Sequence, residues 1–241
     1  MTTAALPRPK DARERPPGAL VERLGSVPYR EAWEIQRERA ARRADGAIPD
    51  TLLLLSHPPV VTLGKSGSVD HLLGSAAELA RRGVEFVETD RGGDITFHGP
   101  GQIVGYAIVD LTPRGRDLHR FLRDLEEVLI RALAESGIRA SRDPGLTGVW
   151  VGDAKLAAMG IRVSRWITHH GFALNVDTDL SFFDLIVPCG ITDKPVTSMR
   201  ALLGRPVDRA EVEAALARAF QDVFGAKPAA LGAKPAAEAA A

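Results

Sequence analysis

Apolar residues along this chain follow two spacings, one typical of helices and one typical of strands. The clearest helical stripe begins at Leu118 and repeats every three or four positions until the next glycine. The same spacing over 29–42 and 76–82 predicts two further helices. Asp208 and Glu211 form a capping pattern at the start of another helix.

Short apolar runs and alternating stretches predict strands through the middle of the chain. They lie at 51–55, 60–63, 84–88, 102–110, 149–151, 155–163 and 167–176. Two prolines, Pro58 and Pro59, separate the first two, and Gly152-Asp153 is a hairpin dipeptide. Because strands and helices do not alternate regularly, we expect an α/β (α+β) fold in which a mixed or antiparallel sheet is flanked by helices.

The two ends differ in composition from the middle. Residues 1–18 combine four prolines with charged residues, which predicts a disordered leader. The pentapeptide AKPAA occurs at 226–230 and again at 233–237, so 225–241 is expected to be a low-complexity Ala/Lys/Pro tail. No proline-rich or Ser/Gly linker divides the remaining residues, which predicts one domain over 19–224.

Charge and cysteine content narrow the classes of function. With 31 basic and 31 acidic side chains, the formal net charge is zero and offers no overall attraction to nucleic acid or an anionic membrane. The apolar runs are shorter than the roughly 20 residues that span a bilayer, and no secretory signal pattern is present. One cysteine excludes an internal disulfide and a multi-cysteine metal site. We therefore expect a cytoplasmic protein without a nucleic-acid or membrane partner.

A glycine-rich segment at 91–102 carries the first candidate chemistry. Its sequence, RGGDITFHGPGQ, contains four glycines and a proline, and glycine lets a backbone approach a ligand closely. The segment is not a dinucleotide-binding or Walker loop, because it contains neither GxGxxG nor GxxxxGK[ST]. Two turns around a short strand would explain the same glycines, so the segment alone does not identify a site.

Lys155 and Cys189 are the other candidates. A lysine at the start of a strand is usually solvated, and a single cysteine is more often an inert buried residue than a nucleophile. Cys189 lies in a Pro-Cys-Gly sequence, which favours a turn over the middle of a core element. A nucleophilic cysteine needs a nearby cation or helix N-terminus that favours the thiolate. Lys155 or one of His98, His169 and His170 could provide that cation.

Four motifs together resemble the lipoyl(octanoyl) transferase family. They are RGGDITFHGPGQ, KLAAMGIRV, HGFALNV and PCGI, in that order, with Lys155 and Cys189 34 positions apart. The resemblance covers about residues 25–205. It implies a biotin/lipoate protein ligase-like mixed sheet flanked by helices, and an acyltransferase that needs no nucleotide, other cofactor or metal.

The resemblance also implies roles for particular residues. Cys189 matches the nucleophile that accepts the acyl group, and Lys155 matches the cation that favours its thiolate. The residues that match the family's substrate-binding segments are Arg91, Gly92, Gly93, Asp94, Ile95, Thr96, Phe97, His98, Ala158, Met159, Gly160, His170, Gly171 and Phe172.

The implied reaction moves an octanoyl or lipoyl group from acyl carrier protein to a lysine of lipoyl domains, as the first step of endogenous protein lipoylation. The implied acceptors are the acyltransferase subunits of 2-oxoacid dehydrogenases and the glycine cleavage H protein. The enzyme is expected to act as a monomer. Because a thioester donor is already activated, a cysteine thiolate can attack it without a nucleotide.

Three alternatives remain open from the residues. An ATP-dependent lipoate or biotin protein ligase would have the same fold, but no adenylate-binding motif is evident. A non-catalytic acyl-carrier-docking protein would not need both Lys155 and Cys189. A zinc site would combine Cys189 with His98, His169 or His170, but no CxxC or HExxH spacing supports it.

Overall fold

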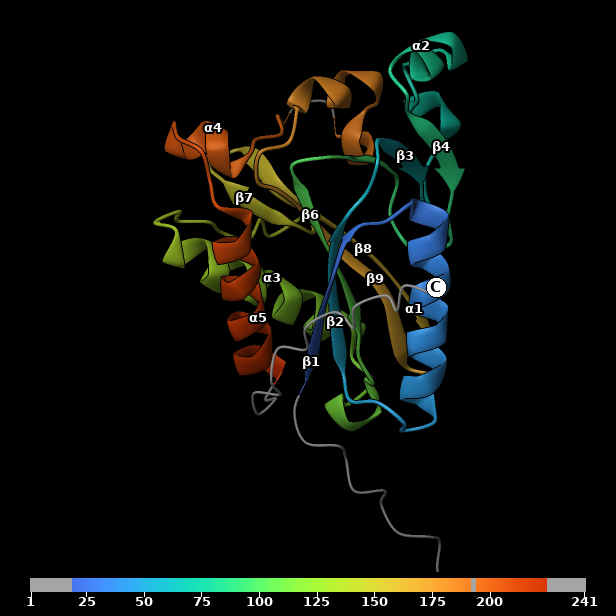
Figure 1. The fold of residues 1–241 in the computed structure, drawn as a ribbon, viewed down its shortest axis with the longest axis vertical. Helices are drawn as coiled ribbons and strands as arrows, with labels where there is room; N and C mark the ends of the chain where they lie inside the picture. The colour runs from blue at the N-terminus through green and yellow to red at the C-terminus, as the bar shows by residue number, and fades with distance from the viewer. Residues whose placement is uncertain (1–18, 192–193, 225–241) are drawn as a thin grey trace, which may run out of the picture.

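A six-stranded mixed sheet forms the centre of the molecule in a computed structural model, which describes residues 19–191 and 194–224 (Figure 1). Across the sheet the strands are β1 (Leu20–Ser26), β2 (Thr51–Ser56), β6 (Gln102–Ile108), β9 (Ile167–Asn175), β8 (Ala154–Ser164) and β7 (Val149–Val151). Strands β1 and β2 are parallel, and every other neighbouring pair is antiparallel. The expected leader 1–18 and tail 225–241 lie outside the described residues.

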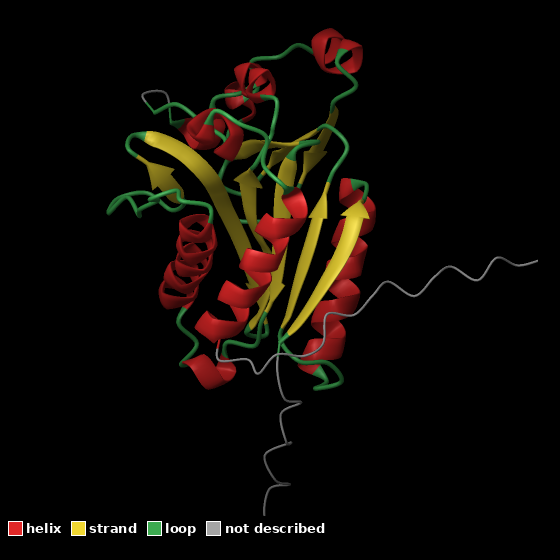
Figure 2. Ribbon diagram, turned by 60° about the vertical axis from the view of Figure 1, so that its left-hand side comes forward, coloured by secondary structure: helices red, strands yellow, loops and turns green. Residues whose placement is uncertain are grey.

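Helices cover both faces of this sheet (Figure 2). On one face, α3 (Leu118–Glu135) and α5 (Arg209–Phe224) pack against each other and against the sheet, enclosing the largest apolar core. On the other face lies α1 (Tyr29–Ala44). Because both faces are covered, β2 is a continuous run of buried leucines rather than an alternating strand.

A second, three-stranded sheet lies at one end of the molecule (Figure 1). Its strands are β4 (Glu85–Glu88), β3 (Val60–Leu63) and β5 (Ile95–His98), with β3 parallel to β4 and antiparallel to β5. The short helices are α2 (Ala76–Arg81), α4 (Met199–Leu203) and the 3-10 helices η1 (Val69–His71), η2 (Thr112–Arg114), η3 (Leu180–Leu185) and η4 (Pro188–Gly190). A separate apolar cluster lies between this sheet, α2 and η3.

The predicted mixed sheet flanked by helices is confirmed, and the longer predicted elements agree with the structure to within a few residues. Strand β1 and helix α4 were not predicted, and β5 is the short strand between turns that was left open as an interpretation of the glycine-rich segment. Among the described residues, no helix combines the length and the apolar character that a membrane span requires.

Candidate active site

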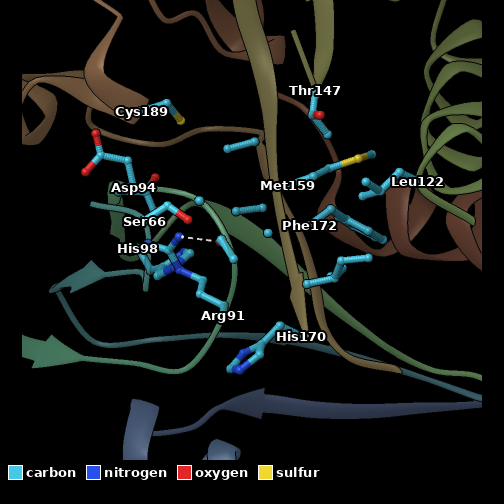
Figure 3. A pocket seen from close by; sticks show the side chains of 18 of the residues that line it. Ser66, Arg91, Asp94, His98, Leu122, Thr147, Met159, His170, Phe172 and Cys189 are labelled. Atoms are coloured by element: carbon cyan, nitrogen blue, oxygen red, sulfur yellow. Dashed lines mark hydrogen bonds between the residues drawn. The ribbon is translucent and has the colours of Figure 1, made fainter. Parts of the chain in front are cut away.

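A cavity of about 620 Å³ opens beside the glycine-rich segment and is lined by residues of both sheets (Figure 3). Its size is within the ~300–1,000 Å³ usual for small-molecule sites. Cys189 and Asp94 lie on one side of it, and the apolar side chains of Leu122, Met159 and Phe172 lie on the other (Figure 3). The cavity therefore combines polar chemistry at one end with an apolar surface at the other.

Cys189 is half-buried in the turn η4, where its backbone has φ 56°. A residue other than glycine is uncommon in this left-handed conformation, and such strain persists only where the surroundings impose it. The neighbouring Pro188 and Gly190 favour a turn, but they do not explain why a cysteine occupies the left-handed position within it. Its side chain faces the cavity instead of the core, which is unusual for a structural cysteine.

Lys155 lies at the start of β8 and is only 6% exposed, in contrast to the solvated lysine usual at a strand start. Its backbone N–H donates to the Pro195 carbonyl at 2.8 Å, and its carbonyl accepts from Thr197 at 2.9 Å. Its ammonium Nζ lies 4.8 Å from the centre of the Trp150 ring. Lys155 and Cys189 both line the main cavity and a smaller space beside it, so the fold brings these two predicted residues together.

The glycine-rich segment is held in place by the buried guanidinium of Arg91. Its Nη2 donates to the Thr62 carbonyl at 2.7 Å and to the Thr62 hydroxyl at 2.9 Å. Burial lowers the pKa of Arg91 from its ordinary value. The N–H of Gly92 donates to the Ile161 carbonyl at 2.9 Å, which attaches the segment to β8.

Successive side chains of β5 point to opposite faces, one toward the cavity and the other toward the small apolar cluster. Thr96 and His98 line the cavity. Ile95 and Phe97 point to the opposite side and pack in the small apolar cluster, where they are 0% and 1% exposed. These two residues therefore belong to the packing that supports the segment and do not line the cavity.

Small residues on neighbouring strands make room for the cavity. Gly160 of β8 lies opposite Gly171 of β9 in the sheet register. A Cβ on Gly160 would come within 2.7 Å of the Gly92 carbonyl oxygen, and a Cβ on Gly171 within 2.1 Å of the Gly105 carbonyl oxygen. These close approaches of backbone to backbone require glycine.

Replacing Gly160 with alanine is expected to push the Gly92 loop away from β8 and to slow the acylation that the family resemblance implies by about tenfold or more. Misplacing a reacting group by about 1 Å can cost roughly 100-fold in rate. Acyl-enzyme formation and thermal unfolding are measured on the same sample. Gly145→Ala is the matched control, because its Cβ would meet nothing nearer than 3.7 Å. Normal acylation by Gly160→Ala would show that the loop position is not critical.

Buried Tyr29, His98 and Tyr106 form the floor of the site, and His57 supports Tyr106 from outside the cavity. His57 Nδ1–H donates to the Val27 carbonyl at 2.6 Å, and its Nε2 accepts from the Tyr106 hydroxyl at 2.7 Å. Burial lowers the pKa of His57 to about 4 and holds the pKa of His98 well below its ordinary value. Both rings are therefore neutral at physiological pH.

His98 connects the floor to the segment that holds Lys155. Its Nδ1–H donates to Gln102 Oε1 at 2.9 Å, and the Gln102 amide donates to Asn175 Oδ1 at 2.9 Å. The Asn175 amide in turn donates to the carbonyl of Thr197 at 3.0 Å, the residue whose N–H binds the Lys155 backbone. A chain of satisfied buried hydrogen bonds of this kind fixes a unique geometry.

His170, like Cys189, is a non-glycine residue with left-handed backbone, at φ 60° within β9. Its N–H donates to Gln36 Oε1 of α1 at 2.7 Å, and its ring Nε2 donates to Asp90 Oδ1 at 2.8 Å. Burial lowers the pKa of His170 to about 3, so the ring is neutral and Nδ1 is an acceptor. The His170 side chain lines the cavity. Its Nδ1 is buried and makes no hydrogen bond within the described residues.

The cavity thus brings together most of the residues that the sequence indicated. Besides those described above, β8 and β9 contribute Ala158, Met159, Gly160, Gly171 and Phe172. Ile161, Ala173, Gly190 and Ile191 also line the cavity and stand in the quoted motifs, although no role was assigned to them. The sequence did not indicate the rest of the lining, which comes from other segments: Tyr29, Ser66, His71, Val104, Tyr106, Leu118, Leu122, Leu146 and Thr147. Within 19–191 and 194–224, no group of three His, Cys, Asp or Glu side chains could hold a metal ion.

Comparison with known proteins gives matches that cover most of the chain. Residues 28–221 match the family model of the lipoyl protein ligase A/B catalytic domain. An octanoyltransferase of Rubrobacter xylanophilus is 52% identical over 218 residues, covering 89% of this chain and 98% of the relative. An octanoyltransferase of Chloroflexus aurantiacus is 53% identical over 211 residues, covering 86% and 95%.

The chain belongs to the octanoyltransferase family. It is therefore an acyltransferase, and its fold is shared with lipoate-protein ligases. The crystal structure of lipoate-protein ligase A bound with ATP superposes with a TM-score of 0.66 at 17% identity, covering 86% of both chains. A bipartite lipoate protein ligase from Thermoplasma acidophilum gives 0.64 at 19% identity, covering 87% of this chain and 84% of the ligase. At these identities the two ligases support the fold alone.

Proposed function

We propose that this enzyme transfers an octanoyl group from acyl carrier protein to a lysine of lipoyl domains through a thioester on Cys189. The observation that carries the proposal is that Cys189 and Lys155 line one cavity whose other side is apolar. A thiol, a buried cation and an apolar surface are the three features that transfer of a medium-chain acyl group through a thioester requires. The family relationship supports the same reaction.

In the first half-reaction the Cys189 thiolate attacks the carbonyl carbon of the donor thioester. A new carbon–sulfur bond forms, the carrier's carbon–sulfur bond breaks, and the carrier thiolate leaves and takes up a proton. The Lys155 ammonium stabilises the Cys189 thiolate before the attack. Leu122, Met159 and Phe172 bury the alkyl chain, and each buried CH₂ contributes about 0.8 kcal/mol.

The tetrahedral intermediate needs hydrogen-bond donors for its oxyanion. The N–H of Gly190 already donates to the Val187 carbonyl at 3.0 Å, and the N–H of Ile191 to the Pro188 carbonyl at 3.0 Å. The backbone N–H groups of Gly190 and Ile191 therefore already have acceptors. We assign the oxyanion contact to the glycine-rich segment instead.

In the second half-reaction the neutral amine of the acceptor lysine attacks the thioester on Cys189. The carbon–nitrogen bond forms, the carbon–sulfur bond breaks, and Cys189 leaves as a thiolate. Once acylation has removed the thiolate charge, Lys155 loses its ionic partner and can release a proton, so that it accepts the proton of the attacking nitrogen as the amide forms. The amide is more stable than the thioester, which drives transfer forward.

Intact-mass spectrometry of the full chain incubated with octanoyl-acyl carrier protein tests this function. We expect an adduct of one octanoyl group, located on Cys189 by peptide mapping and removed by hydroxylamine. Addition of a lipoyl domain should discharge the adduct and increase the mass of the domain by the same amount. An enzyme that modifies the lipoyl domain only when ATP and free octanoate are supplied would instead be a ligase.

A further inference from the structure

A hydrogen-bonded histidine and aspartate lie at the cavity beside Cys189, and the mechanism above uses neither. His71 belongs to η1, Asp94 follows the two glycines of the glycine-rich segment, and both line the cavity. His71 Nδ1 and Asp94 Oδ2 are 2.5 Å apart. The side chain of His71 is 34% exposed and that of Asp94 12%, so the imidazole reaches solvent while the carboxylate is mostly buried.

The pair is fixed on both sides. Asp94 Oδ1 accepts the N–H of Ser68 at 3.2 Å. The carbonyl of His71 accepts the N–H of Val187 at 2.8 Å, and Leu72 forms a bridge with Ile186. The η1 segment is therefore attached to the stretch of chain that leads directly into the Cys189 turn.

The turn that carries Cys189 packs against this pair through Gly190, which has φ +67°. A Cβ on Gly190 would lie 3.0 Å from Asp94 Oδ2 and 3.1 Å from His71 Cε1. The glycine thus lets an imidazole edge and a carboxylate approach the residue that follows Cys189. Because glycine carries only a hydrogen where other residues carry Cβ, both groups fit beside Gly190, next to the residue that bears the thiol.

The hydrogen bond defines the tautomer of His71. A carboxylate only accepts, so Nδ1–H donates to Asp94 and Nε2 carries the lone pair. Among residues 19–191 and 194–224, Nε2 has no hydrogen-bond partner. Imidazole, oriented and charge-compensated by a carboxylate in this way, is the usual general base of proteins.

We propose that His71, oriented by Asp94, removes the proton that the acceptor lysine brings into the site. This inference rests on the proposed function, in which a neutral amine must attack the thioester. A free lysine side chain is protonated at neutral pH. The ammonium transfers one proton to His71 Nε2 and becomes a neutral amine, and His71 becomes an imidazolium paired with Asp94.

The protons then balance across the site. The neutral amine attacks the thioester carbon, Cys189 leaves as a thiolate, and the second amine proton passes to Lys155. His71 releases its proton to solvent, because its ring is partly exposed, whereas Lys155 at 6% exposure has little access to water. The two bases thus have different tasks: Lys155 restores the ion pair with the thiolate, and His71 exports the proton.

Other charged groups near His71 are consistent with this division. Cys189, Lys155 and Arg91 line the same cavity, and Arg91 is held by Thr62 rather than by Asp94. On its own segment Asp70 pairs with the Ser68 hydroxyl and is exposed. Asp94 is therefore the carboxylate that contacts the imidazole directly, and it acts as a positioning residue.

The test uses acyl-enzyme prepared with octanoyl-acyl carrier protein and discharges it with two amines. One is a lipoyl domain, whose lysine is protonated at neutral pH. The other is hydroxylamine, which is uncharged at neutral pH and needs no base to remove a proton before attack. We expect H71Q, whose amide can still donate to Asp94, to slow discharge by the lipoyl domain on the order of 100-fold, the scale of general-base catalysis. Discharge by hydroxylamine should stay within about twofold of wild type, because this amine has no proton that a general base must remove before attack.

Two variants accompany it. D94N leaves the imidazole in place but weakens its orientation, and is expected to show a smaller loss in the same direction. D70N, on the same segment, removes an exposed carboxylate that does not contact His71 and should behave like wild type. Thermal unfolding of each variant is recorded beside the kinetics.

The outcomes separate this inference from the proposed function. If wild type forms no acyl-enzyme, the proposed function fails before His71 is tested. If wild type is acylated and H71Q slows both amines equally, His71 has only a structural role and the inference is wrong. It is equally wrong if H71Q discharges the lipoyl domain at the wild-type rate.

Discussion

Cys189→Ala is expected to leave a folded protein that transfers no octanoyl group and forms no mass adduct. The substitution removes the sulfur atom that we propose carries the acyl group, and removal of a covalent nucleophile cannot be compensated by the remaining cavity. Stability should change little, because the side chain is half-buried at the cavity surface and belongs to none of the apolar core clusters. The measurement is transfer to a lipoyl domain, with intact mass and thermal unfolding on the same preparation.

Cys189→Ser is the closer control, because it keeps the shape of the side chain and replaces sulfur with oxygen. At a pH at which a thiol is partly ionised, a serine hydroxyl is scarcely ionised. We therefore expect almost no turnover from this variant as well. Substantial transfer by either variant, without an adduct on another residue, would exclude a thioester on Cys189 and favour direct transfer from donor to acceptor.

The longer elements could be predicted because the surface that each one buries determines its pattern. One face of α3 packs in the core, which explains the stripe from Leu118, and both faces of β2 are buried, which explains its leucine run. Strand β1 was missed because Glu22 and Arg23 interrupt its apolar pattern. In the structure Glu22 pairs with Arg39 at 2.9 Å and Arg23 with Glu213 at 3.1 Å, and a sequence pattern does not reveal such distant partners.

The site was predictable where one segment contributes several residues, and not where the fold assembles it from distant ones. The glycine-rich segment could be located from its composition, although the alternation that separates Thr96 from Ile95 requires β5 to be recognised as a strand. Tyr29 and His71 lie in segments whose patterns are those of an ordinary helix and an ordinary loop. Only the packing of α1 and η1 against the two sheets brings them to the cavity.

The left-handed residues were beyond sequence reasoning for a different reason. Glycine, asparagine and aspartate are the usual occupants of this conformation, and neither Cys189 nor His170 is one of them. Each is held by contacts from elsewhere in the chain, such as the hydrogen bond from the His170 N–H to Gln36. Strain of this kind costs about 1–3 kcal/mol. Both residues line the cavity, whereas Arg116, Arg165 and Trp166, which also have left-handed backbone, do not.

Lys155→Met is expected to lower octanoyl transfer by roughly 100-fold or more, the scale of a lost acid–base group. Methionine keeps an unbranched apolar stem against Trp150, so the change removes the ammonium with little loss of packing. Without the cation the Cys189 thiolate is less favoured, and alkylation of the thiol by iodoacetamide at neutral pH should slow in parallel. Alkylation is followed by intact mass as a function of pH.

Lys155→Arg separates the two roles proposed for this residue. Arginine supplies a positive charge but does not release its proton at accessible pH, so alkylation and acylation by octanoyl-acyl carrier protein should be spared more than discharge to a lipoyl domain. Lys65→Met is the matched control, because Lys65 is exposed beside the glycine-rich segment and does not line the cavity. If the pH dependence of alkylation is identical in wild type and Lys155→Met, Lys155 does not stabilise the thiolate. Its burial against Trp150 would then be a matter of packing alone.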